Sequence, residues 1–387
     1  MTIFFSKIRI IFLVGLYFDN YHSMKCKELF KLIESEIPLG WQESYDNSGL
    51  QVGNPEDELR GILYSLDVTS DVIDKAIKEK CNVVISHHPL IFNGIKKIQP
   101  SDSIGKIIYK CINERISVYS AHTNFDKHPR GVNYALANAI GLKNQKILIP
   151  EANVLKKLVT YCPQAQAESV RNALFSAGAG QIGNYDSCSF NISGTGSFKA
   201  GENTTPFVGE KNKLHFEPEI RIETIFPSYK QNSVLSALFA HHPYEEVAYD
   251  IYTLDNKHSN LGLGIVGDLP KALPPSDFFT NVKSKLGIKS LRCNSNNINK
   301  IKRIAVCGGS GAAFLNKAIE ENADVYITSD IKYHDFQAAV EKIILLDAGH
   351  FETEIFALNA LKSLISKILP NFAPQINYPD SNWVNMV

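Results

Sequence analysis

The chain has 387 residues, of which 44% are hydrophobic, so it is long enough to bury more than one core. Its 40 lysines and arginines balance its 40 aspartates and glutamates, which gives no reason to expect binding to nucleic acid or to a membrane surface. The seven cysteines include no CxxC pair and favour buried thiols in a reducing compartment over disulfides or a zinc ribbon. The composition therefore predicts a cytoplasmic protein of two or three domains.

Residues 1–23 differ from the rest of the chain. They carry basic residues followed by an apolar run from Ile8 to Phe18, as a signal peptide does. No small-residue cleavage site follows Phe18, and the run is too short to span a bilayer. We therefore expect residues 1–23 to be a disordered or mis-assigned extension, with the fold beginning at Met24; a signal peptide is the alternative.

Residues 24–150 alternate helical and strand patterns, which is typical of an α/β domain. Helical spacing of apolar residues predicts helices over 26–37, 69–80, 101–115 and 131–141. Short apolar runs predict strands over 61–68, 82–86 and 116–120. Thr69 or Ser70 is suited to cap the second helix, and Gly141 to close the last. Several strands end in polar residues, at the sheet edge where open α/β sheets bind ligands.

The pattern changes between residues 151 and 256. Strand, helix, strand, strand, helix and strand are predicted over 154–163, 166–179, 189–198, 219–227, 231–242 and 246–254. This βαββαβ order predicts an α+β ferredoxin-like domain. The α/β pattern then resumes, with strands over 323–330 and 343–349 and a long final helix ended by Pro370. We therefore expect one α/β domain with a mixed sheet, made of 24–150 and 257–387, interrupted by an inserted domain at 151–256.

Three motifs place metal-binding side chains directly after predicted buried strands. Each alone has an ordinary explanation: an exposed histidine pair in SHHPLIF, a turn-forming aspartate in AHTNFDKH, and a surface i, i+4 pair in DAGHFETE. Their shared position after strands lets them converge at one sheet edge. The candidate ligands are His87, His88, Asp126, His350 and Glu354. This nitrogen and oxygen set suits Zn, Mn, Fe or Ni, and two ions would need a bridging water or carboxylate such as Asp126.

Other polar residues near these strands are candidates for supporting roles. His122, Asp330 and His334 are candidates to orient ligands from outside or to act as general acid and base. For Asp330 and His334, a helix cap and a surface histidine explain the pattern equally well. Adjacent residues of a strand point to opposite faces, so His87 and His88 suit two different ions, or one ion and a substrate.

Three further segments are ambiguous. GGSG at 308–311 could hold an anion at a helix N-terminus, but it lacks the lysine of a P-loop, so a tight turn is favoured. WQESYDNSGLQVG, with Trp41, Asn47 and Gly49, is expected to be an ordered loop that could reach the site. AHHPYEE contains a second pair, His241 and His242, but no further ligands converge there, so a helix-to-strand turn is favoured over another metal site.

Taken in order, DNSGLQVG, SHHPLIF, AHTNFD, SDIKYHD and GHFETE resemble the Nif-three-like family of dinuclear-metal proteins, whose members are often called GTP cyclohydrolase 1 type 2 homologues. The resemblance runs from about Met24 to the C-terminus. It implies two divalent cations per subunit held by the five candidate ligands, and a toroidal homohexamer with the metal sites facing its cavity. Longer members carry a ferredoxin-like middle domain, to which HPYEE belongs.

The expected function is metal-dependent hydrolysis of a nucleotide or a phosphorylated small molecule. The family name implies that water opens the imidazole ring of GTP, yet the sequence contains no recognisable guanine or triphosphate site. The alternative is a non-catalytic role, in which the toroid binds metal or serves as a regulatory scaffold and the inserted domain senses a small ligand. Neither function requires nucleic acid or a membrane.

Overall fold

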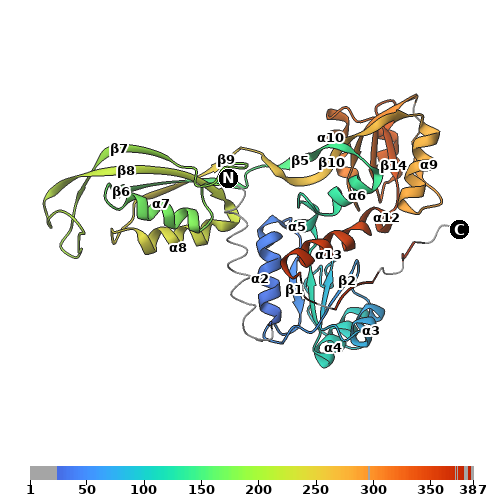
Figure 1. Ribbon diagram of the computed structural model, residues 1–387, viewed down its shortest axis with the longest axis horizontal. Helices are drawn as coiled ribbons and strands as arrows, with labels where there is room; N and C mark the ends of the chain where they lie inside the picture. Colours follow the sequence, from blue (N-terminus) through green and yellow to red (C-terminus); the bar gives the residue numbers. More distant parts are fainter. Residues whose placement is uncertain (1–23, 295–296, 371, 373, 379–381, 385–387) are drawn as a thin grey trace.

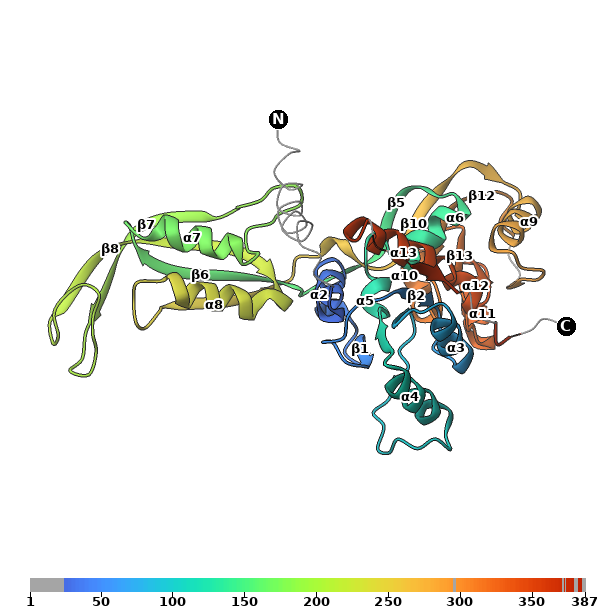
Figure 2. The same cartoon turned by 60° about the horizontal axis from the view of Figure 1, so that its bottom comes forward.

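The computed structural model describes residues 24–294, 297–370, 372, 374–378 and 382–384, so the predicted extension at 1–23 lies outside the described residues. The molecule is elongated (Figures 1 and 2). The described residues before 152 and after 257 form a body of two lobes, each built on its own sheet, and a third sheet projects from this body. Among the described residues, no helix is long and apolar enough to cross a membrane.

The first lobe contains a five-stranded sheet in the order β1-β4-β3-β2-β15. Its strands are β1 (Gly49–Val52), β2 (Ile62–Ser65), β3 (Val83–Ser86), β4 (Ser117–Ser120) and β15 (Gln375–Asn377). Every residue of β2, β3 and β4 is buried, because helices cover both faces of the sheet. These helices are α2 (Cys26–Glu36) and α13 (Phe356–Ile368) on one face, and α3 (Ser70–Lys78) and α4 (Ser103–Glu114) on the other.

The register of this sheet decides where the functional side chains emerge. β2, β3 and β4 are parallel, and Ser65, Ser86 and Ser120 lie side by side as the last residues of the three strands. The segments that follow them therefore leave the sheet at the same edge. The predicted caps next to these strands are confirmed: the Thr69 hydroxyl accepts a hydrogen bond from the Val72 N–H at 3.1 Å, and Gly141 closes its helix in a left-handed conformation.

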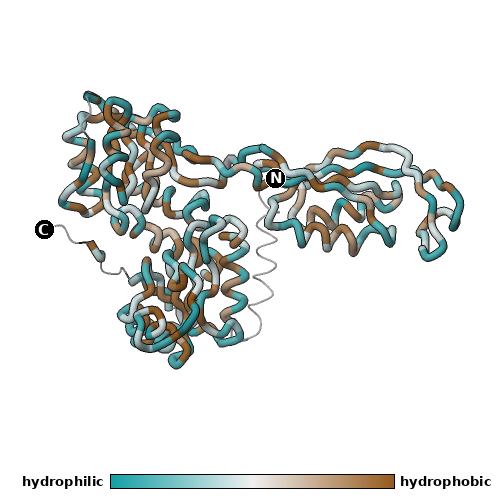
Figure 3. Tube along the Cα trace, turned by 180° about the vertical axis from the view of Figure 1, so that it is seen from behind, coloured by the Kyte–Doolittle hydropathy of each residue, from teal (hydrophilic) through white to brown (hydrophobic). Residues whose placement is uncertain are grey.

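The second lobe contains a six-stranded sheet in the order β11-β14-β13-β12-β10-β5. Its strands are β5 (Lys143–Glu151), β10 (His258–Leu273), β11 (Arg292–Cys293), β12 (Ile301–Val306), β13 (Val325–Thr328) and β14 (Ile344–Asp347). The helices of this lobe are α6 (Val132–Ile140), α9 (Pro275–Leu286), α10 (Leu315–Glu320) and α11 (Tyr333–Ala339). Hydrophobic segments gather inside both lobes (Figure 3).

The third sheet has the order β7-β8-β6-β9 and is antiparallel throughout. Its elements are β6 (Leu155–Pro163), α7 (Ala167–Ser176), β7 (Phe190–Lys199), β8 (Leu214–Pro227), η2 (Ser228–Lys230), α8 (Gln231–His241) and β9 (Tyr249–Leu254). Both helices cover one face of the sheet (Figure 1). The predicted βαββαβ ferredoxin-like arrangement is confirmed.

The α/β fold class is confirmed, but its internal division was not foreseen. Two mixed sheets are present where a single mixed sheet was expected: β2, β3 and β4 lie in one, and β12, β13 and β14 lie in the other, which β10 and β5 extend in antiparallel orientation. The expected final helix is also divided, into α12 (His350–Glu354) and α13. WQESYDNSGLQVG is only partly a loop: its first residue, Trp41, is the last residue of η1 (Leu39–Trp41), and it contains the edge strand β1.

Candidate metal centre

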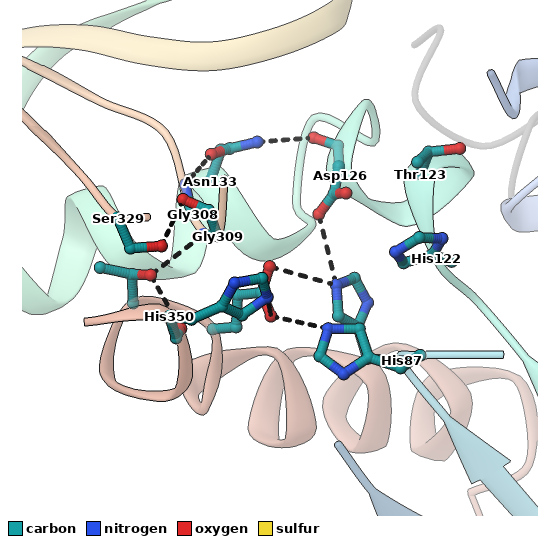
Figure 4. Close-up of polar contacts among 12 residues, drawn as sticks. His87, His122, Thr123, Asp126, Asn133, Gly308, Gly309, Ser329 and His350 are labelled. Atoms are coloured by element: carbon teal, nitrogen blue, oxygen red, sulfur yellow. Dashed lines mark hydrogen bonds and ion pairs between the residues drawn. The ribbon is translucent and has the colours of Figure 1, made fainter. Parts of the chain in front are cut away.

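Predicted ligands from both lobes meet where the two lobes face each other (Figure 4). His87 and His88 follow β3, and Asp126 is the last residue of α5 (Thr123–Asp126), the short helix after β4. The second lobe contributes His350 and Glu354 from α12, which follows β14. The five candidate ligands therefore come together as predicted, but they come from the edges of two sheets instead of one.

The alternation of side chains along a strand predicted that His87 and His88 would point to opposite faces. In the structure they point to the same centre. Their ring centroids are 5.0 Å apart, and the Nε2 atoms of both approach Glu354. The strand alternation no longer applies, because β3 ends at Ser86 and both histidines already belong to the following loop. Both rings are thus available to one centre.

Four histidines at this centre are held in the same way by the protein. In each ring Nδ1 contacts an oxygen acceptor of the protein, which orients the ring so that Nε2 is the nitrogen turned toward the centre. For His87, His88, His122 and His350 the acceptors are, in order, the Ala121 carbonyl at 2.9 Å, Asp67 at 2.8 Å, Asp46 at 2.7 Å and Asp330 at 2.8 Å. Histidines that bind metals are held in this way, with the second ring nitrogen bonded to a carboxylate or a carbonyl.

The Glu354 carboxylate lies among three of these Nε2 atoms and is buried. Its Oε2 is 3.0 Å from His88 Nε2 and 3.1 Å from His350 Nε2, while its Oε1 is 3.8 Å from His87 Nε2. The two oxygens thus face different histidines. Glu354 is therefore better placed to bridge two ions than Asp126, for which the sequence suggested this role.

Two buried atoms of the centre lack a hydrogen bond among the described residues: His87 Nε2 and Asp126 Oδ1. They are 3.6 Å apart, which is too far for a hydrogen bond. A buried polar atom without a partner is costly, so two such atoms facing each other fit a position at which a cation would bind. The donor set of imidazole nitrogens and carboxylate oxygens fits a divalent transition metal, as predicted.

Ligand atoms within 4.8 Å of one another form two candidate groups: His87, His88 and His122, and His88, His350 and Glu354. His122, predicted as a supporting residue, thus lies directly in the cluster. Asp330 has the predicted orienting position on His350. The structure does not bring His334 into the cluster: it lies on exposed α11, where its ring contacts Gln337 and Tyr333.

The close packing of acids and histidines shifts their pKa values. Burial would lower the pKa of His88, but hydrogen bonds with Asp67 and Glu354 outweigh it and raise this pKa to about 10. For His350 burial is likewise outweighed by Glu354 and Asp330, and its pKa rises to about 9. Burial raises the pKa of Asp126 to about 7. Without a metal these groups hold protons near neutral pH, so a binding cation must displace them.

The chain was compared with known proteins. Residues 24–379 match the family model Duf34/NIF3 (NGG1p interacting factor 3). The chain belongs to the NIF3 family. The family resemblance predicted from the motifs is thereby confirmed.

Relatives of this NIF3-family protein match over nearly their whole length. A Bacillus subtilis protein named GTP cyclohydrolase 1 type 2 homolog is 37% identical over 346 residues, covering 89% of this chain and 93% of the relative. A Staphylococcus epidermidis protein of the same name is 36% identical over 362 residues, covering 92% and 98%. The crystal structure of a Bacillus cereus protein related to NIF3 superposes with a TM-score of 0.79 at 38% identity, covering 95% of this chain and all of that one.

The GGSG segment of this NIF3-family protein forms the expected tight turn, but it also shapes the centre. Gly309 has a φ of +63°, and a Cβ atom at this position would lie 2.1 Å from Glu354 Oε1. Asn133 joins this turn to the ligand loop, since its amide donates to the Asp126 carbonyl and its oxygen accepts from Gly308 N–H. Sequence reasoning missed the role of Gly309, although its place directly after β12 was a usable signal.

Asp46 was also missed, although the neighbouring Asn47 and Gly49 were singled out. Its Oδ1 contacts His122 Nδ1, and its Oδ2 accepts a hydrogen bond from the Thr123 N–H at 3.0 Å. Burial opposes ionisation of Asp46, but the hydrogen bonds from His122 and Thr123 outweigh it and hold its pKa well below the usual range. Asp46 therefore stays charged and keeps the His122 ring in position.

We expect Asp46→Asn to weaken metal binding by about 10- to 100-fold, the usual effect of losing such an orienting residue. The amide keeps the shape of the side chain but removes the charge that stabilises Nδ1–H of His122. Competition with a chelating dye measures the affinity. Asp74→Asn, a change of an exposed residue on α3, is the control; equal affinities in the two variants would contradict the assigned role of Asp46.

The second histidine pair behaves as expected. His242 is buried, its Nε2 lies 2.8 Å from the Tyr161 carbonyl, and its Nδ1 accepts the Tyr244 N–H at 3.1 Å. His241 is exposed, with Nδ1 3.0 Å from the Ala237 carbonyl. Over the described ranges neither residue belongs to a candidate metal group. The pair forms the predicted helix-to-strand turn.

Proposed function

We propose that this protein holds two divalent cations and hydrolyses a nucleotide or a related phosphorylated small molecule. The observation that carries the proposal is the arrangement of four histidines, each with Nδ1 held by the protein and Nε2 turned toward a centre that contains two acidic residues. The side chains proposed to hold the ions are His87, His88, His122, Asp126, His350 and Glu354. The names of the relatives, GTP cyclohydrolase 1 type 2 homolog, support hydrolytic chemistry on a nucleotide.

Two cations in such a site lower the pKa of water and polarise the group that water attacks. The chain supplies the frame for this chemistry. Glu354 places negative charge between the rings, Asp126 turns a carboxyl oxygen toward His87, and Asp330 lies against Nδ1 of His350. Because these contacts exist before any ligand arrives, the site needs little reorganisation to bind the ions.

Access to the centre favours catalysis over a purely structural site. His87 is completely buried, but 38% of the His350 side chain and 51% of the Asp330 side chain are exposed. The centre is therefore open on its second-lobe side, where a substrate could enter. A structural metal site is usually closed, with its coordination completed by protein.

A non-catalytic role in metal binding or regulation is the second candidate. The projecting ferredoxin-like domain favours it, because a sheet with one open face far from the metal centre adds nothing to hydrolysis. We include assembly into a toroidal homohexamer in both proposals, as the resemblance of the sequence motifs implies.

Metal analysis of protein purified from its native host, followed by a screen of nucleotides and phosphoesters with that preparation, tests the proposal. We expect turnover that falls by more than about 100-fold in His88→Ala and Glu354→Ala, since each removes a group that positions the reacting water. His241→Ala, which changes an exposed histidine outside the centre, is expected to be fully active. A metal-loaded protein that is inert toward the whole panel would favour the non-catalytic role.

A further inference from the structure

Two exposed aromatic side chains border the metal centre on its first-lobe side. The ring centroid of Phe92 lies 6.0 Å from that of His122, with the rings nearly perpendicular. The ring of Tyr45 lies 6.4 Å from that of Phe92. Phe92 is 44% exposed and Tyr45 65% exposed. Other aromatic side chains of this chain are also exposed, but this pair lies against a histidine of the metal centre, where a bound molecule would contact it.

The two rings are held in place by bonds between their loops. Tyr45 immediately precedes Asp46, which fixes His122, and Phe92 follows His88 in the SHHPLIF motif. The Asn47 amide donates to the Ile91 carbonyl at 2.6 Å, and the Gln51 amide donates to the Asn47 carbonyl at 2.6 Å. The aromatic pair is therefore arranged before a ligand binds, which lowers the entropic cost of binding.

We propose that Phe92, supported by Tyr45, binds a flat conjugated ring of the substrate by stacking. This inference rests on the proposed function and names the part of the nucleotide that the protein recognises: the heteroaromatic base. Aromatic side chains that are exposed and fixed are the usual platforms for bases, because every base has a π-face. The attacked group of the same molecule would then lie over the neighbouring histidines.

The residues around Phe92 and Tyr45 also indicate whether this pair can distinguish one nucleobase from another. Discrimination between bases needs polar groups that bond to base edges. The amides beside the rings, those of Asn47 and Gln51, already serve the contacts between the two loops. Stacking on Phe92 is therefore expected to accept guanine and adenine alike. This agrees with the lack of a guanine-binding motif in the sequence.

Equilibrium dialysis with metal-loaded protein tests the inference, using GMP, AMP and ribose 5-phosphate as probes. We expect GMP and AMP to bind with similar affinity, and both about 10-fold more tightly than ribose 5-phosphate, the typical effect of one base stacked on an aromatic ring. Phe92→Ala should lower the affinity for GMP to that for ribose 5-phosphate, whereas Phe92→Tyr should preserve it. Tyr185→Ala, at an aromatic residue that is 75% exposed outside the centre, should have no effect.

Metal content and molar mass by light scattering are measured for each variant. Loss of GMP binding at unchanged metal content and mass supports the inference. Equal binding of GMP and ribose 5-phosphate by the unaltered protein overturns it, as does a Phe92→Ala variant with full affinity. A change in molar mass for Phe92→Ala also overturns it, because the rings would then form a subunit contact.

These outcomes are separate from the test of hydrolysis. Turnover of phosphoesters that lack a ring, without a preference for GMP, would overturn the stacking role and leave the hydrolase proposal standing. Binding of GMP that depends on Phe92, without turnover of any compound, would support the stacking site and contradict the hydrolase.

Discussion

Replacing Glu354 with glutamine is expected to remove most of the bound metal from the protein, with a loss of affinity of at least about 100-fold, beyond the range for residues that only orient ligands. Glutamine has the same shape, but it lacks the charge that faces three histidines. Because Oε1 faces His87 and Oε2 faces His88 and His350, both candidate groups should be affected. Plasma mass spectrometry of the dialysed protein measures the metal content.

Glu352→Gln is the matched control. Glu352 lies on the same short helix, but its Oε1 accepts a hydrogen bond from Asn382 and does not face the histidines. This variant should keep the metal content of the unaltered protein. Full metal content in Glu354→Gln would show that the ions are held elsewhere, and the proposed centre would have to be abandoned.

Gly309→Ala should damage the centre without removing any ligand. The added Cβ would lie 2.1 Å from Glu354 Oε1 and 3.3 Å from His350 Nε2, so the Glu354 carboxylate must move away from its position among the histidines. The left-handed backbone at Gly309 adds a cost of roughly 1–3 kcal/mol in the free energy of unfolding. We expect both a lower melting temperature and a loss of bound metal.

Gly287→Ala separates these two effects. Gly287 has a similar φ of +70°, but a Cβ atom there meets nothing within 4 Å. This variant should lose unfolding free energy only through the strained backbone and should keep its metal. If Gly309→Ala were destabilised to the same extent as Gly287→Ala and retained its metal, the close approach of Gly309 to Glu354 would have no functional importance.

The sequence was sufficient to predict which motifs converge. His87, His88, Asp126, His350 and Glu354 each follow a buried apolar run, and parallel strands bring such positions to the edge of their sheet, although here the edges of two sheets meet. The ferredoxin-like order of elements in residues 151–256 could also be predicted, because apolar residues repeat with a different spacing in helices and in strands. The αL closure at Gly141 and the Thr69 cap followed from residue type alone.

What the sequence did not reveal depends on contacts between distant segments. Asp46 and Asp67 are ordinary loop aspartates until folding places them against His122 and His88. The place of β5 in the second sheet depends on its pairing with β10, a strand on the far side of the inserted domain in the sequence. Phe92 looked like one more apolar residue of a strand-end motif, and only its exposure distinguishes it.

The location of the centre between two lobes has a consequence for the mechanics of the protein. His88 and Glu354 are separated by 266 positions in the chain, yet their side chains lie 3.0 Å apart. Ions bound between them would act as a removable cross-link that closes a very long loop, comparable to a disulfide that a chelator can open. The concentration of available metal would then determine how strongly the first and second lobes are held together.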